Sequence, residues 1–173
     1  GEYTQYDKNN KWRSKLTGKF KNHNITKGKL ILKFSEGNME YNGELRCTWF
    51  GSILSPMPHG KGVKKNLSSK FKSYSIANGF WIEASQNGKG THTYFKDKNF
   101  TNKLKEYKGS FKNNEYHGFG TLIDYLKNNK FKYIGNWKNG KMHGYGKSID
   151  YEQGRTYEGD FKNNTMAGLG MMI

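Results

Sequence analysis

The sequence predicts an all-β fold, an elongated single-layer sheet of successive antiparallel β-hairpins that twists along its length. Three observations lead to this prediction. Glycine and aromatic residues recur at fixed spacings from residue 107 onward, which is typical of a repeat architecture. The 22 glycines, against two prolines, indicate regular tight turns rather than a disordered linker, because their spacing is constant. No stretch shows the apolar period of a helix.

The repeat reads Tyr-x-Gly-x-Phe/Trp, five residues, His-Gly-x-Gly, four residues and a closing Tyr. If its first residue is position 0, glycine occupies positions 2, 11 and 13, an aromatic residue positions 4 and 18, and histidine position 10. The strong copies contain Tyr107, Gly109, Phe111, His117, Gly118, Gly120 and Tyr125; Tyr133, Gly135, Trp137, His143, Gly144, Gly146 and Tyr151; and Tyr157, Gly159, Phe161, Ala167, Gly168 and Gly170.

Degenerate copies precede the strong ones. The same spacing finds Ala77, Gly79, Trp81, Asn87, Gly88, Gly90 and Phe95, then Tyr41, Gly43 and Leu45 with a late His59-Gly60-Lys61-Gly62, and then Leu16, Gly18, Phe20, Gly28 and Phe34. We therefore predict a repeat domain over residues 16–173 and a polar lead-in over residues 1–15. About six repeats begin near residues 16, 41, 77, 107, 133 and 157, the first three degenerate, with an apolar insertion at about 46–58.

Each repeat has the pattern of a β-hairpin. Side chains alternate along a strand, so the aromatic residue, the glycine and the second aromatic residue at positions 0, 2 and 4 share one face. Segments such as GTLIDY (120–125) and GKSIDY (146–151) are predicted to form the returning strand. The segment between the strands, such as KNGKMHG (138–144), is predicted to supply the turn. The glycine at position 2 leaves room for a ring from the adjacent strand.

Charge and composition narrow the class of partner. A net charge of +16 favours an acidic partner, whether nucleic acid, anionic lipid or protein, although Asn and Lys are abundant throughout. The lone Cys47 rules out an internal disulfide framework and fits an intracellular, reducing compartment. No apolar run is long enough to span a membrane, and no signal peptide is present. Because the chain does not begin with Met, we expect it to be a piece of a longer protein.

The repeated histidines and glycines are assigned structural roles. Successive hairpins would place His59, His117 and His143 about 10 Å apart, too far to share a metal ion held at about 2.0–2.1 Å, so we expect turn roles and no metal site. The Gly-x-Gly pairs lie between strands, whereas a phosphate-binding loop needs a helix after it. No catalytic constellation can be assembled with specificity. We predict no enzyme activity, no cofactor and no small-molecule substrate.

The aromatic face is the first candidate partner surface. A single sheet has no second layer, so we expect its rings to pack mainly against one another and to remain partly exposed, as in an interaction site. The alternative is a ladder of rings filled by its own side chains. The predicted partner-binding residues are Tyr107, Phe111, Tyr133, Trp137, Tyr157, Phe161 and Trp81.

Position 5 supplies a basic row on the other face. It is occupied by Lys21, Arg46, Lys112, Lys138 and Lys162. The row either keeps an exposed face soluble or guides anionic lipid or acidic protein. Because rings and charges fall on opposite faces, single-stranded nucleic acid, which stacks on rings between charges, is disfavoured.

The insertion is a second candidate contact surface. It contains Trp49, Phe50, Leu54 and Met57, the most apolar residues outside the repeat pattern. The alternative is that it folds back and caps the N-terminal end of the sheet. The last strand is expected to present an open edge that an intact assembly covers or pairs.

The segments YKGSFKNNEYHGFGTLIDY and YIGNWKNGKMHGYGKSIDY closely resemble the MORN (membrane occupation and recognition nexus) repeat. The resemblance is strong from residue 107, fair over 77–95 and loose before that. It implies a twisted antiparallel sheet of hairpins with no catalytic residues of its own. It also implies the settings in which the family occurs: ciliary radial spokes, cytoskeletal scaffolds, membrane junctions, and accessory regions of lipid kinases and methyltransferases.

We therefore predict a non-catalytic scaffold or protein–protein interaction module that docks protein subunits of a larger complex. The resemblance alone implies a cytoplasmic setting such as a ciliary axoneme or the cytoskeleton. Two alternatives stay open: a peripheral membrane tether that binds anionic phospholipid through the basic face, and an accessory MORN region of a larger enzyme.

Overall fold

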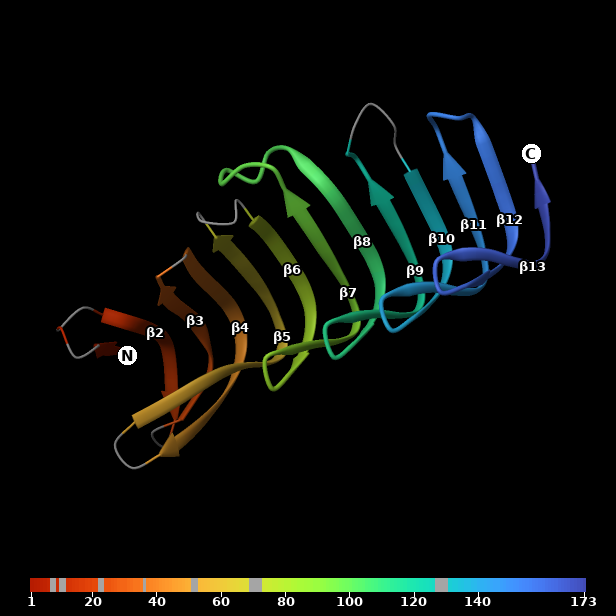
Figure 1. Ribbon diagram of the computed structural model, residues 1–173. Coiled ribbons are helices and arrows are strands. Elements are labelled where there is room, and N and C mark those ends of the chain that lie inside the picture. Colours follow the sequence, from red (N-terminus) through yellow and green to blue (C-terminus); the bar gives the residue numbers. More distant parts are fainter. Residues whose placement is uncertain are drawn as a thin grey trace.

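The chain forms one open antiparallel sheet of 13 strands, each paired with the next along the sequence. The computed structural model describes residues 1–6, 9, 12–21, 24–35, 37–50, 53–68, 73–126 and 131–173. The sheet is elongated, with the two termini at its opposite ends (Figure 1), and the predicted all-β fold of successive hairpins is confirmed. The strands are β1 (Glu2–Tyr6), β2 (Trp12–Lys21), β3 (Asn24–Phe34), β4 (Gly37–Phe50), β5 (Ile53–Ser68), β6 (Ser73–Ile82), β7 (Ser85–Phe95), β8 (Lys103–Lys112), β9 (Glu115–Asp124), β10 (Phe131–Lys138), β11 (Lys141–Asp150), β12 (Arg155–Lys162) and β13 (Thr165–Met172).

The hairpin turns are shorter than predicted. Two residues, Asn139 and Gly140, connect β10 to β11, with φ of 51° and 74°. Two successive positive φ values define a type I′ turn, which favours Asn and Gly and matches the twist of the flanking strands. Asn113–Asn114 and Asn163–Asn164 repeat this geometry. The turn predicted over 138–144 is therefore wrong, because the returning strand already begins at Lys141.

In the three strong repeats, a β-bulge follows the turn and uses the first glycine of Gly-x-Gly. In β8 and β9, Gly109 pairs with Gly120 and Phe111 with Tyr116, so Ser110 alone faces residues 117–119. Gly118, in the middle of these residues, has a φ of +65°. A bulge of this kind bends its strand, and Figure 1 shows the hairpins from β6 onward bending near their turns.

Glycines form a continuous row across the sheet. A Cβ added to Gly109 would lie 2.5 Å from the Cα of Gly120 and 2.6 Å from Tyr107 Oη, so no side chain fits there. The row lets rings lie directly against the backbone of the neighbouring strand. Its members, in register, are Gly18, Gly28, Gly43, Gly62, Gly79, Gly90, Gly109, Gly120, Gly135, Gly146, Gly159 and Gly170.

Two segments outside the strong repeats also join the sheet. Residues 2–6, expected to be part of a polar lead-in, form β1 and pair with β2. The insertion lengthens the β4–β5 hairpin, where Arg46 pairs with Met57 and Phe50 with Ile53. Its backbone therefore continues the β4–β5 pairing in register, and Figure 1 shows this end of the hairpin reaching toward the N-terminal side of the sheet.

The core is built mainly from the residues at positions 0 and 4, joined by Leu30 and Leu122 of the returning strands. One cluster contains Leu16, Leu30, Tyr41, Leu45, Ala77 and Trp81. The other contains Tyr107, Phe111, Leu122, Tyr133, Trp137, Tyr157 and Phe161. A single-layer sheet thus buries its apolar side chains on one face, with the glycine row beneath them.

Candidate docking surfaces

The predicted partner-binding rings are buried. Their exposed fractions run from 0% for Tyr107 and Tyr133 to 8% for Tyr157. The expectation that they remain partly exposed is wrong. The rings therefore do not offer the accessible surface on which their predicted partner-binding role depended. The buried set is Trp81, Tyr107, Phe111, Tyr133, Trp137, Tyr157 and Phe161.

Side chains from both ends of each bent hairpin cover the rings. Tyr116, at position 9, stacks on Tyr107 with 3.8 Å between ring centroids. Phe111 of the same repeat and Trp137 of the next approach Tyr107 edge-on, at 5.0 and 5.4 Å. A flat strand would hold positions 0 and 4 about 13 Å apart, so the bend together with the leaning side chains brings these rings into contact.

The core tyrosine hydroxyls of the three strong repeats donate hydrogen bonds to the backbone. Tyr107 Oη donates to the Ser110 carbonyl oxygen at 2.9 Å, and Tyr133 Oη donates to that of Asn136 at 3.0 Å. Burial raises the pKa of Tyr107 and of Tyr133 to about 12. These hydroxyls remain neutral near neutral pH, and their hydrogen bonds fix each ring against the backbone of its own strand.

The basic row lies at the tips of the hairpins. Lys112, Lys138 and Lys162 are exposed and directly precede the turns, on alternate strands about 10 Å apart. No ion pair of these lysines occurs in the described part of the chain, whereas Arg46 Nη1 lies 3.3 Å from Glu83 Oε1. The side chain of Lys21 lies outside the described residues. What the row binds stays a prediction.

The insertion is described mainly by its backbone. Trp49 pairs with Leu54 at the far end of the β4–β5 hairpin. The side chains of Trp49, Phe50 and Leu54 lie outside the described residues, and that of Met57 is half-buried. A contact role for this segment stays a prediction.

The repeated histidines lie in strands. His59, His117 and His143 belong to β5, β9 and β11, each in the bulge, so the predicted turn role is wrong. Their Nδ1 atoms are buried and make no hydrogen bond within the described structure. Over the described ranges, no three His, Cys, Asp or Glu side chains gather as a metal site would require.

The core becomes polar in the third repeat, where Ala77 replaces the position 0 tyrosine. Lys64 and His92 flank Ala77 in register on the neighbouring strands. The buried Gln86 fills the space above the glycines, and its Nε2 donates to two backbone carbonyls at 3.1 and 3.3 Å. The His92 ring stacks on Tyr94 at 4.3 Å. Burial, and then the charge of Lys64, lowers the pKa of His92 to about 4.

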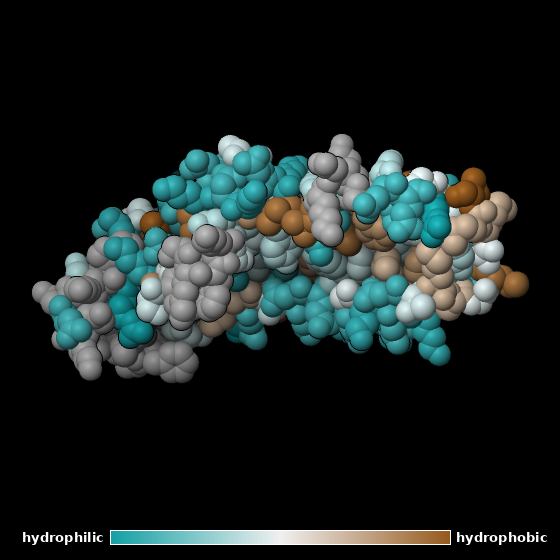
Figure 2. Space-filling model, turned by 45° about the horizontal axis from the view of Figure 1, so that its top comes forward, coloured by the Kyte–Doolittle hydropathy of each residue, from teal (hydrophilic) through white to brown (hydrophobic). Residues whose placement is uncertain are grey.

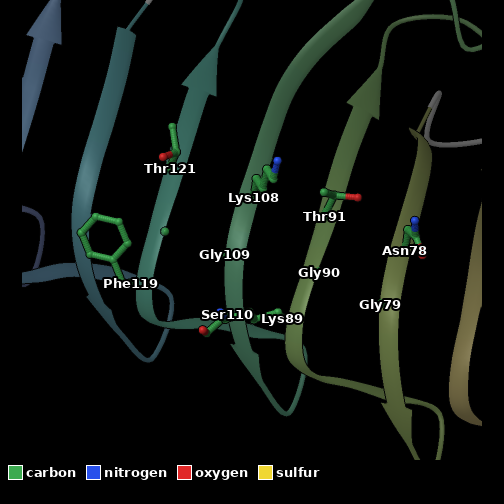
Figure 3. A pocket seen from close by; sticks show the side chains of 11 residues that line it. Asn78, Gly79, Lys89, Gly90, Thr91, Lys108, Gly109, Ser110, Phe119 and Thr121 are labelled. Atoms are coloured by element: carbon green, nitrogen blue, oxygen red, sulfur yellow. The ribbon is translucent and has the colours of Figure 1, made fainter.

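A groove of about 640 Å³ lies on the face opposite to the rings and crosses β6 to β9. Figure 3 shows side chains from the four strands projecting to one side, above and below the glycine row. The groove is lined by Gly79, Gly90, Gly109 and Gly120 in the middle, by Asn78, Thr91, Lys108 and Thr121 on one wall, and by Lys89, Ser110 and Phe119 on the other.

Sequence reasoning missed this surface, although the motif contains a signal for it. The residue between the two glycines of Gly-x-Gly points to the face opposite to them. It is Phe119, Tyr145 and Leu169 in the last three repeats, with exposed fractions of 62%, 58% and 90%. In the two preceding repeats it is Lys61 and Lys89. The apolar patch thus grows toward the C-terminal end of the sheet.

The last strand, β13, is an exposed edge. Met171, Met172 and Ile173 have exposed fractions of 63%, 58% and 70%. Figure 2 shows apolar surface at this end of the molecule, while hydrophilic surface dominates most of the remaining coloured area in that view. The described residues contain no helix long and apolar enough to cross a membrane.

The glycine row, the type I′ turns and the bulges recur in the same register in the strong repeats, and a family model for the MORN repeat matches residues 107–125, 133–152 and 157–173. Residues 107–173 are MORN repeats. A search among curated proteins finds no match for it. MORN repeats are generally interaction modules for proteins or lipids, and the family is generally non-catalytic.

The structure extends the MORN-type hairpin upstream of the matched segments. Glu83 and Ala84 form a two-residue turn with φ of 47° and 65°, although neither residue favours that geometry. In β4 and β5, Glu44 faces residues 59–61 across a bulge, with Gly60 at a φ of +69°. The second and third repeats therefore keep the glycine bulge of the strong ones.

Proposed function

We propose that this MORN-repeat protein is a non-catalytic scaffold that docks partner proteins within a larger assembly. The groove on the face opposite to the buried rings supports this most directly. The rings stabilise the sheet from one face, which leaves exposed side chains such as Phe119 and Lys108 free on the other. Apolar surface rimmed by polar groups is typical of protein interaction sites. The groove thus replaces the ring face as the first candidate docking surface.

The proposed setting is a reducing, cytoplasmic compartment, in a ciliary or cytoskeletal assembly. The single cysteine of the sequence, Cys47, supports the compartment, and the family resemblance supports the assembly. A tagged chain imaged in its own cells tests this setting: the expected signal follows axonemes or cytoskeletal filaments, and a secreted or lumenal signal would contradict it.

Crosslinking in cell extracts, followed by mass spectrometry, tests the docking function. We expect partner proteins crosslinked to β6–β9 in the wild type and lost in a Phe119→Asp variant. Tyr151→Asp is the matched control, because Tyr151 is 55% exposed in a turn outside the groove. The same crosslinks in both variants would show that the groove does not dock them.

A peripheral membrane tether is the second candidate, supported by the exposed row of Lys112, Lys138 and Lys162. Co-sedimentation with acidic vesicles across a salt series tests it, because binding by exposed charges weakens as ionic strength rises. Replacing the three lysines by Glu is expected to abolish vesicle binding and to leave groove-bound proteins in place. Failure of acidic vesicles to bind the wild type at low ionic strength rules this function out.

A further inference from the structure

We propose that the groove across β6–β9 binds a short, extended, acidic peptide segment that carries one apolar side chain. This inference rests on the proposed docking function and names the class of partner. The groove crosses four strands, and three strand spacings amount to about 14 Å. At about 3.3 Å per residue, a peptide running along the glycine row fills this length with four to five residues.

The floor of the groove admits a peptide backbone. Gly79, Gly90, Gly109 and Gly120 lie side by side in one register row and carry no side chains. Asn78, Thr91, Ser110 and Thr121 flank this floor with side chains that both donate and accept hydrogen bonds. An extended peptide needs such partners for its backbone N–H and C=O groups, which lose water on binding.

Two lysines give the groove its preference for acidic residues. Lys89 and Lys108 are exposed, stand on opposite walls and are diagonal neighbours on β7 and β8, about 7–8 Å apart. Neither lysine has an ion pair in the described structure, and the described lining of the groove includes no Asp or Glu. The nearby Lys103 and Lys105 instead already contact Glu106 and Asp124, at 2.6 and 3.8 Å.

The two lysines fit an adjacent pair of acidic residues. Successive side chains of an extended peptide point to opposite sides, so neighbouring carboxylates reach opposite walls. Phe119 lies on the wall of Lys89, two strands further along, about 10 Å away. An extended peptide returns a side chain to the same wall only at every second residue, that is, about 7 or 13 Å along. The structure therefore favours two adjacent acidic residues and an apolar residue two or four positions from the one that reaches Lys89.

A membrane surface fits the groove less well than a peptide does. The lysines stand beside a narrow floor and the exposed ring of Phe119, whereas Lys112, Lys138 and Lys162 stand apart at the hairpin tips. Anionic lipid is accordingly an outcome that the experiment distinguishes.

The test is selection of a displayed library of random heptapeptides on the full 173-residue chain, counter-selected with a Lys89→Glu/Lys108→Glu variant. We expect enriched peptides with adjacent Asp or Glu residues and an apolar residue two or four positions from one of them. Their affinity should fall at least about tenfold in the double variant, since opposed charges become like charges, and about threefold or more in Phe119→Ala. Lys112→Glu/Lys138→Glu is the matched control, with the same charge change outside the groove, and should keep the affinity within about twofold.

Three results would overturn the inference: no enrichment over the counter-selecting variant, a consensus without acidic residues, or equal losses in both charge-reversed variants. Peptides that bind independently of the groove variants would reject this site and leave a docking function elsewhere on the chain. Acidic vesicles that bind through Lys89 and Lys108, in the absence of any enriched peptide, would reject the peptide as the occupant. The unfolding temperature of each variant, expected to match the wild type because these side chains are exposed, separates loss of binding from loss of structure.

Discussion

Replacing Gly135 by Ala is expected to disrupt the glycine row. The added Cβ would lie 2.5 Å from the Cα of Gly146, 2.7 Å from Tyr133 Oη and 2.8 Å from the carbonyl oxygen of Tyr145. Two of these three atoms belong to the backbone of β11, so they can move away only if β10 and β11 separate. The third belongs to a ring that is fully buried.

The expected loss follows from three effects. Overpacking a filled site costs about 1–3 kcal/mol. Displacing Tyr133 removes its 3.0 Å hydrogen bond to the Asn136 carbonyl, which contributes about 1 kcal/mol. It also disturbs the edge-on contacts with Trp137 and Phe161 at 5.1 and 5.0 Å, about 0.5–1.5 kcal/mol for each pair. We expect the free energy of unfolding to fall by about 3–7 kcal/mol, against a typical total of about 5–15 kcal/mol.

Urea denaturation followed by tryptophan fluorescence measures this loss. Gly140→Ala is the control, because a Cβ there meets no atom within 4 Å and the residue has a φ of +74°. Gly140→Ala should lower the free energy of unfolding by only about 1–2 kcal/mol, the cost of placing alanine in the left-handed conformation. If Gly135→Ala unfolds at the same urea concentration as Gly140→Ala, close packing of the glycine row is not what excludes a side chain.

Three further predictions concern the core. Trp137→Ala should lower the free energy of unfolding by about 3–5 kcal/mol, whereas Phe119→Ala should change it by about 0.5 kcal/mol or less; equal thermal shifts would contradict the assignment of Trp137 to the core. Folding lowers the pKa of His92 to about 4, so the folded chain favours the neutral ring. The stability of the folded chain is therefore unaffected by the ionisation of His92 above about pH 6.5. It decreases as the pH falls from 6.5 to 4, by up to about 3 kcal/mol. A His92→Gln variant should therefore lose less stability than the wild type between pH 7 and 4, and parallel curves would contradict the burial of His92. Because the pKa values of Tyr107 and Tyr133 rise to about 12, the stability they supply is complete below about pH 10 and is lost as the pH rises through 12; tyrosinate absorbance that titrates fully near pH 10 in the folded chain would refute this.

Local sequence signals predicted the hairpins but misplaced their turns. Asn113–Asn114 and Asn139–Gly140 are strong type I′ candidates, because both residue types tolerate positive φ. The neighbouring His-Gly was assigned to the same turn, although Gly118 and Gly144 instead form the bulge that follows it. A glycine by itself marks an unusual backbone conformation without telling a turn from a bulge.

Burial could not be predicted from strand parity. Parity placed Tyr107, Phe111 and Trp137 correctly on one face, but a flat sheet leaves such a face open to solvent. The bend brings rings of neighbouring repeats to within 5.4 Å of one another and removes them from the surface. The docking groove lies on the other face, where parity also places its wall side chains, but parity alone does not show that this face is hollowed.

The sequence by itself determined the period of the repeat, the hairpin order and the separation of a ring face from a charged face. These follow from spacing along the chain, because an alternating strand has only two faces. The tertiary structure alone decided which face is core and which is free for a partner. Burial depends on how far each hairpin bends and on which ring of the next repeat covers it. Those contacts join residues far apart in the sequence, such as Tyr107 and Trp137, and no local spacing encodes them.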